Sequence, residues 1–303
     1  MELKTAELYK SFGEKAVLRG VSFSVTGGRA LGILGRNGAG KTTTIRIIMQ
    51  VFSPDSGEVL LDGQPMTPGK VKIGYLPEER GMYPKKSVMQ QLLYFGMLAG
   101  LKKREAAANA DRLLERLEMT EYRDKRLDTL SKGNQQKIQL VATLIADPDI
   151  IILDEPFSGL DPVNAMLLKD LVRELIAKGR IVLFSSHQMN YIEEFCDDIA
   201  ILNGGKIVLS GDIGEIKRSF DRRTILLSGA DTKKIDAFLT EQALPFVSAH
   251  DITDGKVAVT LRAPQDKEAL YKALEPLAGS VDAFVVKEPT LNEIFVHYTE
   301  GAI

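Results

Sequence analysis

Residues 35–42 read GRNGAGKT and directly follow an apolar run at residues 30–34. The pattern G-x-x-x-x-G-K-[ST], placed between a strand and a helix, forms a loop whose backbone N–H groups converge on phosphate oxygens. A helix expected from about Lys41 would add partial positive charge at its N-terminus. Lys41 would reach the terminal phosphates, and the Thr42 hydroxyl would be placed for Mg²⁺. The stretch therefore predicts a phosphate-binding loop at the end of a buried strand.

A second apolar strand ends in two acids, because residues 150–155 read IIILDE. Carboxylates at the end of a buried strand are costly unless they have partners or a role. Asp154 would hold Mg²⁺ through water, and Glu155 would orient and deprotonate the attacking water. Alone, the pair could equally cap the following loop, but beside a phosphate loop it favours nucleotide hydrolysis.

The order of expected elements indicates an α/β protein with two parts. Apolar strands alternate with helices through residues 150–202, which is typical of a buried, mostly parallel sheet. After residue 214 the pattern changes to βαββαβ, the ferredoxin-like order, followed by a last helix over residues 290–298. We expect a first domain over residues 1–220, with helices over about 85–145, and a small α+β accessory or regulatory domain over 221–303.

Residues 130–136, LSKGNQQ, narrow the class of nucleotide hydrolase to which the chain could belong. They lie before the acidic strand. It resembles the signature sequence of ABC (ATP-binding cassette) ATPases, commonly LSGGQ. Lys132 and Asn134 depart from the common form, whereas Ser131, Gly133 and Gln135 are interpreted as retained. The resemblance implies that this serine and glycine bind the γ-phosphate held by a second protomer. It also implies a P-loop fold of ABC type, with a mostly parallel core sheet, an antiparallel β subdomain and a helical subdomain.

Further matches to the family follow in chain order. Residues 158–161, SGLD, resemble the D-loop, and His187 resembles the switch histidine that contacts the γ-phosphate. Phe12 matches the aromatic position on which adenine stacks, with Tyr9 as the weaker candidate. Where the family usually has glutamine, this chain has Glu78, whose carboxylate can offer Mg²⁺ and water the same oxygen with an added charge. We therefore expect Glu78 to keep that role.

The resemblance implies a complete set of site residues. The expected catalytic residues are Lys41, Glu78, Glu155 and His187. The expected Mg²⁺ ligands are Thr42, Glu78 and Asp154. The residues expected to contact ATP are Phe12, Gly35, Asn37, Gly38, Ala39, Gly40, Lys41, Thr42, Thr43, Ser131, Gly133, Gln135 and Asp161.

Composition excludes several other classes. The chain has 303 residues, a net charge of −2 and one cysteine, Cys196. A disulfide framework within the chain is therefore excluded, and the absence of a strongly basic part gives nucleic-acid binding no electrostatic basis. The longest uncharged stretch, residues 87–101, is shorter than the roughly 18–20 residues that span a bilayer. We expect a cytoplasmic protein, peripheral on the cytoplasmic face of the cell membrane.

The expected function is an ATP-hydrolysing subunit that powers an ABC transporter. Residues 288–295, EPTLNEIF, resemble the extension found on ATPase subunits of ABC-2-type exporters, which favours export. The expected partners are an integral membrane permease and a second ATPase subunit; we expect a homodimer, and a heterodimer stays open. The apolar segment 87–101 is either core or a permease contact. The alternative is a soluble ABC-type ATPase that acts as a regulatory or nucleic-acid-associated switch.

Overall fold

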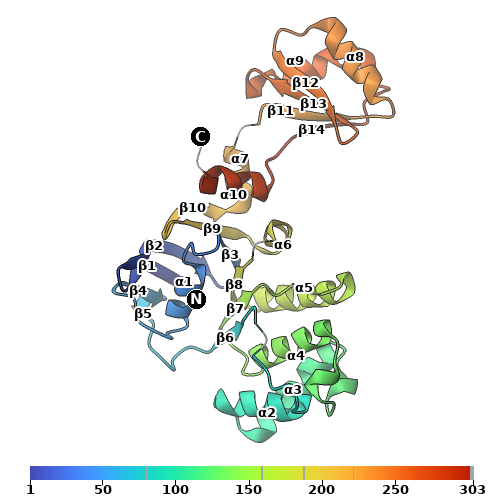
Figure 1. The fold of residues 1–303 in the computed structure, drawn as a ribbon. Coiled ribbons are helices and arrows are strands. Elements are labelled where there is room, and N and C mark those ends of the chain that lie inside the picture. The colour runs from blue at the N-terminus through green and yellow to red at the C-terminus, as the bar shows by residue number, and fades with distance from the viewer. Residues whose placement is uncertain (80, 158–159, 187, 221, 301–303) are drawn as a thin grey trace. The chain divides into compact units, whose positions relative to one another are not determined.

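A computed structural model describes residues 1–79, 81–157, 160–186, 188–220 and 222–300 (Figure 1). The chain folds into two compact units. The first contains Met1–Ile213 together with the C-terminal residues from Phe295 onward, and the second contains Gly214–Ile294.

The core of the first unit is a six-stranded sheet ordered β10-β9-β3-β8-β7-β6. Its strands are β3 (Ala30–Gly35), β6 (Ile73–Leu76), β7 (Ile150–Asp154), β8 (Ile181–Ser185), β9 (Asp198–Asn203) and β10 (Lys206–Asp212). Neighbouring strands are parallel except for β9 and β10. The inner strands β3, β7 and β8 are almost wholly buried. This burial on both faces explains why they read as continuous apolar runs.

An antiparallel sheet ordered β2-β1-β4-β5 packs beside this core. Its strands are β1 (Glu2–Phe12), β2 (Lys15–Thr26), β4 (Ser56–Leu61) and β5 (Gln64–Pro65). Side chains alternate between buried and exposed along much of β1 and β2, as expected of strands with one face on the core. Leu3, Leu8 and Val21 from this sheet join Ile33 and Ile45 in one buried cluster.

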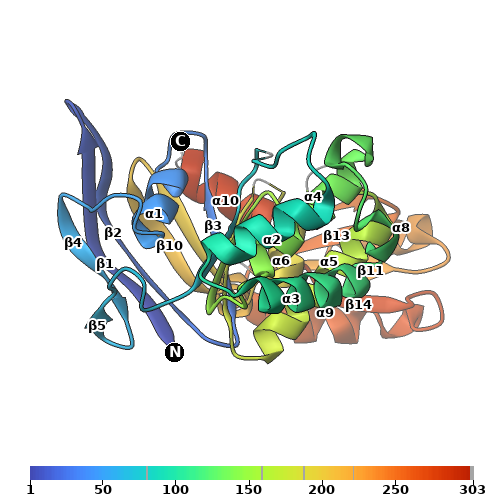
Figure 2. The same ribbon diagram turned by 90° about the horizontal axis from the view of Figure 1, so that it is seen from below.

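The helices of the first unit fall into two groups. One group lies outside the helical subdomain and contains α1 (Lys41–Ile48), α5 (Pro162–Ala177) and α6 (Met189–Phe195). The helical subdomain contains α2 (Val88–Leu98), α3 (Lys103–Arg116) and α4 (Lys132–Leu144), with short 3-10 turns at Thr120–Tyr122 and Leu127–Thr129. Figure 2 shows α2 and α3 side by side. Ser87 and Gln90 form a reciprocal capping box that fixes the start of α2.

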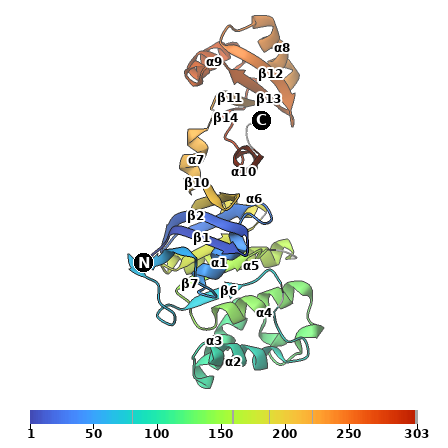
Figure 3. The same ribbon diagram turned by 60° about the vertical axis from the view of Figure 1, so that its left-hand side comes forward.

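The second unit is a four-stranded antiparallel sheet ordered β12-β13-β11-β14, with helices on one face (Figure 3). Its elements are β11 (Thr224–Ser228), α8 (Thr232–Gln242), β12 (Val247–Thr253), β13 (Lys256–Leu261), α9 (Lys267–Ala273) and β14 (Ala283–Val286), with 3-10 turns at Pro264–Asp266 and Glu275–Leu277. Ile225, Ile235 and Leu270 belong to one buried cluster that joins the sheet to both helices. The predicted βαββαβ order is confirmed.

The end of the first domain differs from the expectation. Contacts divide the chain between Ile213 and Gly214, a few residues before the expected boundary, and group the residues from Phe295 with the first unit. Two elements at this end of the first unit, β10 and α7 (Ile213–Ser219), were not predicted from the sequence. Strand β10 is mostly half-buried or exposed, so it lacks the apolar run that marks its neighbours. The last helix, α10, covers Leu291–Glu300.

Candidate nucleotide-hydrolysis site

The candidate site lies at one edge of the central sheet. Strands β3, β8, β7 and β6 are parallel, so their carboxyl ends meet at the same edge. Loops at this edge are the usual ligand-binding position in open α/β sheets. The phosphate loop follows β3, the acid pair ends β7, and Glu78 follows β6. The topology therefore brings together three motifs that lie far apart in the sequence.

The phosphate loop has the backbone conformation that its glycines permit. Gly38 and Gly40 have φ values of 81° and 114°, where residues with a Cβ are strained. A Cβ on Gly40 would also lie 2.6 Å from Cδ2 of Leu18. Gly40 is the residue before α1, so the loop leads directly into the N-terminal turn of this helix. This arrangement presents backbone N–H groups to an anion.

Lys41 is already held against the loop. Its Nζ donates to the carbonyl oxygens of Gly35 at 2.6 Å and Arg36 at 3.3 Å. Burial lowers the pKa of Lys41, and the negative charges of Asp154, Glu155 and Glu78 oppose that shift. The lysine and all three carboxylates therefore interact electrostatically at one place.

Asp154 is positioned by the two strands beside β7. It lies opposite Ser185 of β8 in register, and the Tyr75 hydroxyl of β6 donates to its Oδ2 at 3.3 Å. Burial raises the pKa of Asp154, and hydrogen bonds from Ser185 and Tyr75 partly oppose the shift. Burial also raises the pKa of Tyr75 to about 12, with the charge of Asp154 adding to the effect. Asp154 should therefore lose its charge at a higher pH than an exposed aspartate would.

Glu155 is the most constrained carboxylate of the site. Its exposed fraction is 7%, and the Ser186 hydroxyl donates to its Oε2 at 2.9 Å. Its backbone has φ of 49°, in the left-handed region that costs a non-glycine residue about 1–2 kcal/mol. Its N–H donates to the Ser185 carbonyl at 2.9 Å, which holds that conformation in place. Such strain at a buried acid is typical of a functional position.

Glu78 is exposed in the segment that follows β6. The amide of Gln139, from α4, donates to the carbonyls of Pro77 at 3.4 Å and Glu79 at 3.3 Å on either side of Glu78. Gln139 is buried, with an exposed fraction of 5%. Helix α4 is thereby attached to the segment that carries Glu78.

The signature residues lie at the start of α4. Ser131 precedes this helix, and its Oγ accepts from the Asn134 N–H at 3.2 Å. Gln135 donates from Nε2 to the Leu130 carbonyl at 2.9 Å. Helix α4 packs on α2, α3 and β6, whereas α1, which follows the phosphate loop, packs on β2 and β3. Figures 1 and 3 show α1 and α4 in different parts of the first unit.

Other expected residues have separate positions. Asp161 is the N-cap of α5, where it accepts hydrogen bonds from the N–H and side chain of Asn164, and these bonds lower its pKa. His187, Ser158 and Gly159 lie outside the described residues, so their predicted roles stay predictions. Thr42 is exposed at the start of α1, and Thr43 is half-buried beside it.

Phe12 has the exposure that a stacking surface needs. It is 51% exposed and packs edge-to-face on Phe52 with ring centroids 5.6 Å apart. Lys10 lies 5.8 Å from the Phe12 centroid and is itself paired with Asp55 at 2.7 Å. Phe52 and Lys10 thus brace one ring while part of its surface stays open.

A Phe12→Ala variant should bind ATP roughly 5- to 150-fold more weakly, because base stacking on an aromatic ring contributes about 1–3 kcal/mol. Phe12→Tyr keeps the ring and should retain the affinity. Equilibrium titration with ATP and with GTP measures both variants, and the loss should be similar for the two nucleotides because every base has a stackable face. A loss confined to kcat would contradict the assignment.

Three residues that support the site were not predicted from the sequence: Tyr75, Ser186 and Gln139. In the sequence, Tyr75 precedes Glu78 by three residues and Ser186 directly precedes His187, but nothing in these stretches indicates which acid each contacts. Gln139 lies one helical turn beyond Gln135, and that spacing was the only available signal.

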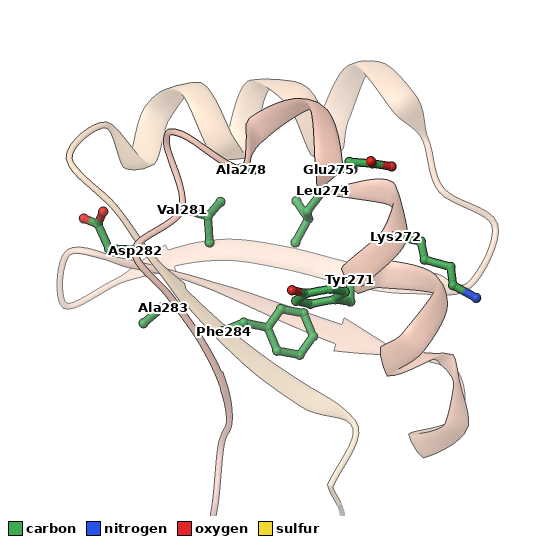
Figure 4. Close-up of a pocket in the computed structure, with 9 residues that line it drawn as sticks. All are labelled: Tyr271, Lys272, Leu274, Glu275, Ala278, Val281, Asp282, Ala283 and Phe284. Atoms are coloured by element: carbon green, nitrogen blue, oxygen red, sulfur yellow. The ribbon is translucent and has the colours of Figure 1, made fainter.

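The described residues contain no group of three or more His, Cys, Asp or Glu that could hold a metal. A cation here would rely on a hydroxyl, one or two carboxylates and the nucleotide itself, which suits Mg²⁺. A different hollow, of about 480 Å³, lies in the second unit between α9 and β14 (Figure 4). Tyr271 packs edge-to-face on Phe284 there, with ring centroids 5.7 Å apart.

A parallel sheet that presents a phosphate loop and an acid pair at one edge is the framework of a P-loop nucleotide hydrolase. Residues 18–158 match the ABC transporter family, and residues 211–299 match the C-terminal domain described as ATP-binding protein DrrA1-3-like. The chain belongs to the family of ABC transporter ATP-binding proteins.

The chain is similar to known proteins over nearly its whole length. An uncharacterized ABC transporter ATP-binding protein of Alkalihalophilus pseudofirmus is 43% identical over 265 residues, which cover 87% of this chain and 97% of that protein. Nod factor export ATP-binding protein I of Rhizobium meliloti is 30% identical, with 98% of this chain and 88% of that protein covered. The linearmycin resistance ATP-binding protein of Bacillus subtilis is 29% identical, with 98% of each covered.

Solved structures support the same conclusion. The ATP-binding subunit of an ABC transporter superposes with a TM-score of 0.67 at 30% identity, covering 79% of this chain and 100% of that chain. An ATP-binding cassette in its ADP conformation gives 0.64 at 26%, covering 71% and 92%. The predicted fold class, family and enzyme class are confirmed: the chain is an ATP-binding, ATP-hydrolysing subunit of an ABC transporter.

Proposed function

We propose that the chain hydrolyses ATP with Glu155 as general base and with Mg²⁺ held by Thr42, Asp154 and Glu78. The observation that carries the proposal is the geometry of Glu155, a buried acid in a strained conformation, oriented by Ser186 and sharing its surroundings with Lys41. When bound, Mg²⁺ would neutralise charge that develops on the phosphates. His187 would contact the γ-phosphate, as the family resemblance implies.

Two copies of the chain would complete two sites. The signature at α4 and the phosphate loop at α1 pack on different elements, so a second cassette is needed to bring Ser131, Gly133 and Gln135 to the γ-phosphate. Asp161, exposed at the start of α5, would lie in the same interface. Because one chain carries both halves, a two-fold homodimer gives two complete sites. ATP would hold the pair together, and hydrolysis would release it.

The proposed partner that ATP hydrolysis drives is a membrane permease. A groove of about 380 Å³ lies between β6, α2 and α4, and its lining includes Tyr75, Pro77, Phe95, Leu98, Gln139 and Thr143. Leu98 is 71% exposed, and Met97 and Tyr94 beside it are about half exposed. An exposed apolar patch of this kind marks a protein contact. A permease segment seated there would touch the strand that leads to Glu78, so its movement would reach the hydrolysis site.

The proposed location of the chain and the proposed direction of transport depend on these partners. No helix in the described part of the chain has the length and apolar character needed to cross a bilayer. We place the chain on the cytoplasmic face of the cell membrane, bound to its permease. The Nod factor export and linearmycin resistance relatives support export. The transported molecule would contact the permease. The alternative, a soluble ABC-type ATPase that acts as a regulatory or nucleic-acid-associated switch, is not favoured by the relatives.

A Leu98→Glu variant tests the permease contact. A charge in the centre of an apolar contact is costly to desolvate, so transport coupling and co-purification with the permease should be lost. ATP turnover of the isolated chain should stay near wild type. Val51→Glu, at a 61% exposed position away from the groove, is the matched control. Normal coupling in Leu98→Glu, measured by permease-stimulated ATPase activity, would place the permease elsewhere.

A further inference from the structure

The last turn of α10 contacts the phosphate loop. Glu300, the final residue of α10, forms an ion pair with Arg36. Arg36 is the second residue of the loop GRNGAGKT, and its carbonyl accepts the hydrogen bond from Lys41 at 3.3 Å. The two paired residues are 264 positions apart, so the contact is a product of the tertiary fold. Neither Arg36 nor Glu300 is among the site residues predicted from the sequence.

A second, independent contact fixes the same turn. Asn203, at the end of β9, donates from its amide to the carbonyls of Tyr298 and Thr299, each at 3.3 Å. Carbonyls in the last turn of a helix lack partners within the helix, so a side-chain amide there acts as a C-terminal cap. Thr299 is buried, with an exposed fraction of 9%. The last turn of α10 is therefore held within the first unit, and Glu300 is directed to Arg36.

The strength of the ion pair suits a contact that can be exchanged. The side chains of Arg36 and Glu300 are 55% and 50% exposed. Exposed pairs of this kind change an equilibrium by a factor of about two to five and weaken with salt. The pair is too weak to be needed for folding, but it neutralises a cation in the loop that would receive the phosphates.

We propose that Glu300 is a brake on nucleotide binding that acts through Arg36. While Glu300 pairs with Arg36, the guanidinium charge is cancelled and a carboxylate lies near the incoming phosphates. Binding of ATP and seating of α10 then oppose each other, and the opposition is reciprocal. Glu300 is thus a positioning residue and does not contact the nucleotide. This inference rests on the proposed placement of the ATP phosphates at residues 35–42.

The test is ATP affinity of the full chain, measured by equilibrium dialysis in EDTA, together with kcat and KM in Mg²⁺. Glu300→Gln should tighten ATP binding by about two- to fivefold and lower KM, with kcat at saturating ATP unchanged. Glu300→Asp, which keeps the charge, should restore wild-type affinity. The gain should vanish at about 0.5 M salt, because screening removes interactions between exposed charges.

Two further variants make the test decisive. In an Arg36→Gln background, Glu300→Gln should have no effect on affinity, because its charge partner is gone. Asn203→Ala, which unseats the turn without altering the charge of either residue, should shift affinity in the same direction. Unchanged or weaker ATP binding by Glu300→Gln, or a gain that persists without Arg36, would overturn the brake.

The proposed phosphate site can fail separately. If Lys41→Ala leaves ATP affinity unchanged, the placement of the phosphates is wrong. The proposed role of Glu300, which depends on that placement, is then refuted as well. If Lys41→Ala abolishes binding while Glu300→Gln does nothing, the phosphate site stands and only the brake is refuted.

Discussion

A Glu155→Gln variant should hydrolyse ATP about 10²- to 10⁴-fold more slowly than the wild type, the usual contribution of a positioned general base. The amide keeps the size of the side chain and can still accept the Ser186 hydrogen bond of 2.9 Å. It cannot take a proton from water. ATP binding should therefore persist, and the dimer should accumulate with ATP trapped in it. Single-turnover hydrolysis and the mass of the ATP-bound species measure the two effects.

Matched variants separate the base from its surroundings. Ser186→Ala removes the residue that orients Glu155 and should reduce kcat by a smaller factor, since the carboxylate remains. Glu174→Gln changes an acid that pairs with Arg116 away from the sheet edge, and it should leave turnover near wild type. Near-normal turnover in Glu155→Gln would remove this residue from the role of base.

Lys41→Ala should lower turnover by about 10²- to 10³-fold, the cost of losing one preorganised charge at a reacting centre. ATP affinity should fall as well, because Lys41 is the half-buried cation among the carboxylates of Asp154, Glu155 and Glu78. Without it, their negative charge would repel the phosphates. Titration with ATP and steady-state hydrolysis give the two quantities.

Two control variants separate the role of Lys41 from the effect of its charge alone and from the general effect of replacing a lysine. Lys41→Arg keeps the charge, but its planar fork differs from the compact ammonium that donates to Gly35 and Arg36. It should recover part of the affinity and little of the turnover. Lys272→Ala, at an exposed position in the second unit, should change neither. Full hydrolysis by Lys41→Ala would show that the phosphates bind elsewhere.

Much of the site could be predicted because its motifs stand at strand ends. The glycine-rich loop after β3 and the acids at the end of β7 are local patterns whose chemistry requires those residues at that spacing. Parallel strands bring such ends to one edge, so the sequence also predicts their proximity. The ferredoxin-like order of the second unit could also be predicted from local patterns, because it follows from the order of strand-like and helix-like stretches along the chain.

The partners of these residues could not be predicted. That Ser186 contacts Glu155, and Tyr75 contacts Asp154, depends on register between β6, β7 and β8. The pairing of Arg36 with Glu300 depends on the path of the whole chain. Strand β10 was not predicted from the sequence because it is an edge strand with little apolar pattern. The predicted role of His187 stays open, since that residue lies outside the described part of the chain.

The central claim is that two copies of this chain share each hydrolysis site, and mixing two inactive variants tests it most directly. Lys41→Ala disables the phosphate loop but keeps the signature, and Ser131→Arg disables the signature but keeps the loop. Each variant alone should be nearly inactive. In an equal mixture, half of the two-fold pairs would be mixed, each with one intact site, so about a quarter of wild-type turnover should return. A mixture no more active than its two components would contradict the shared site.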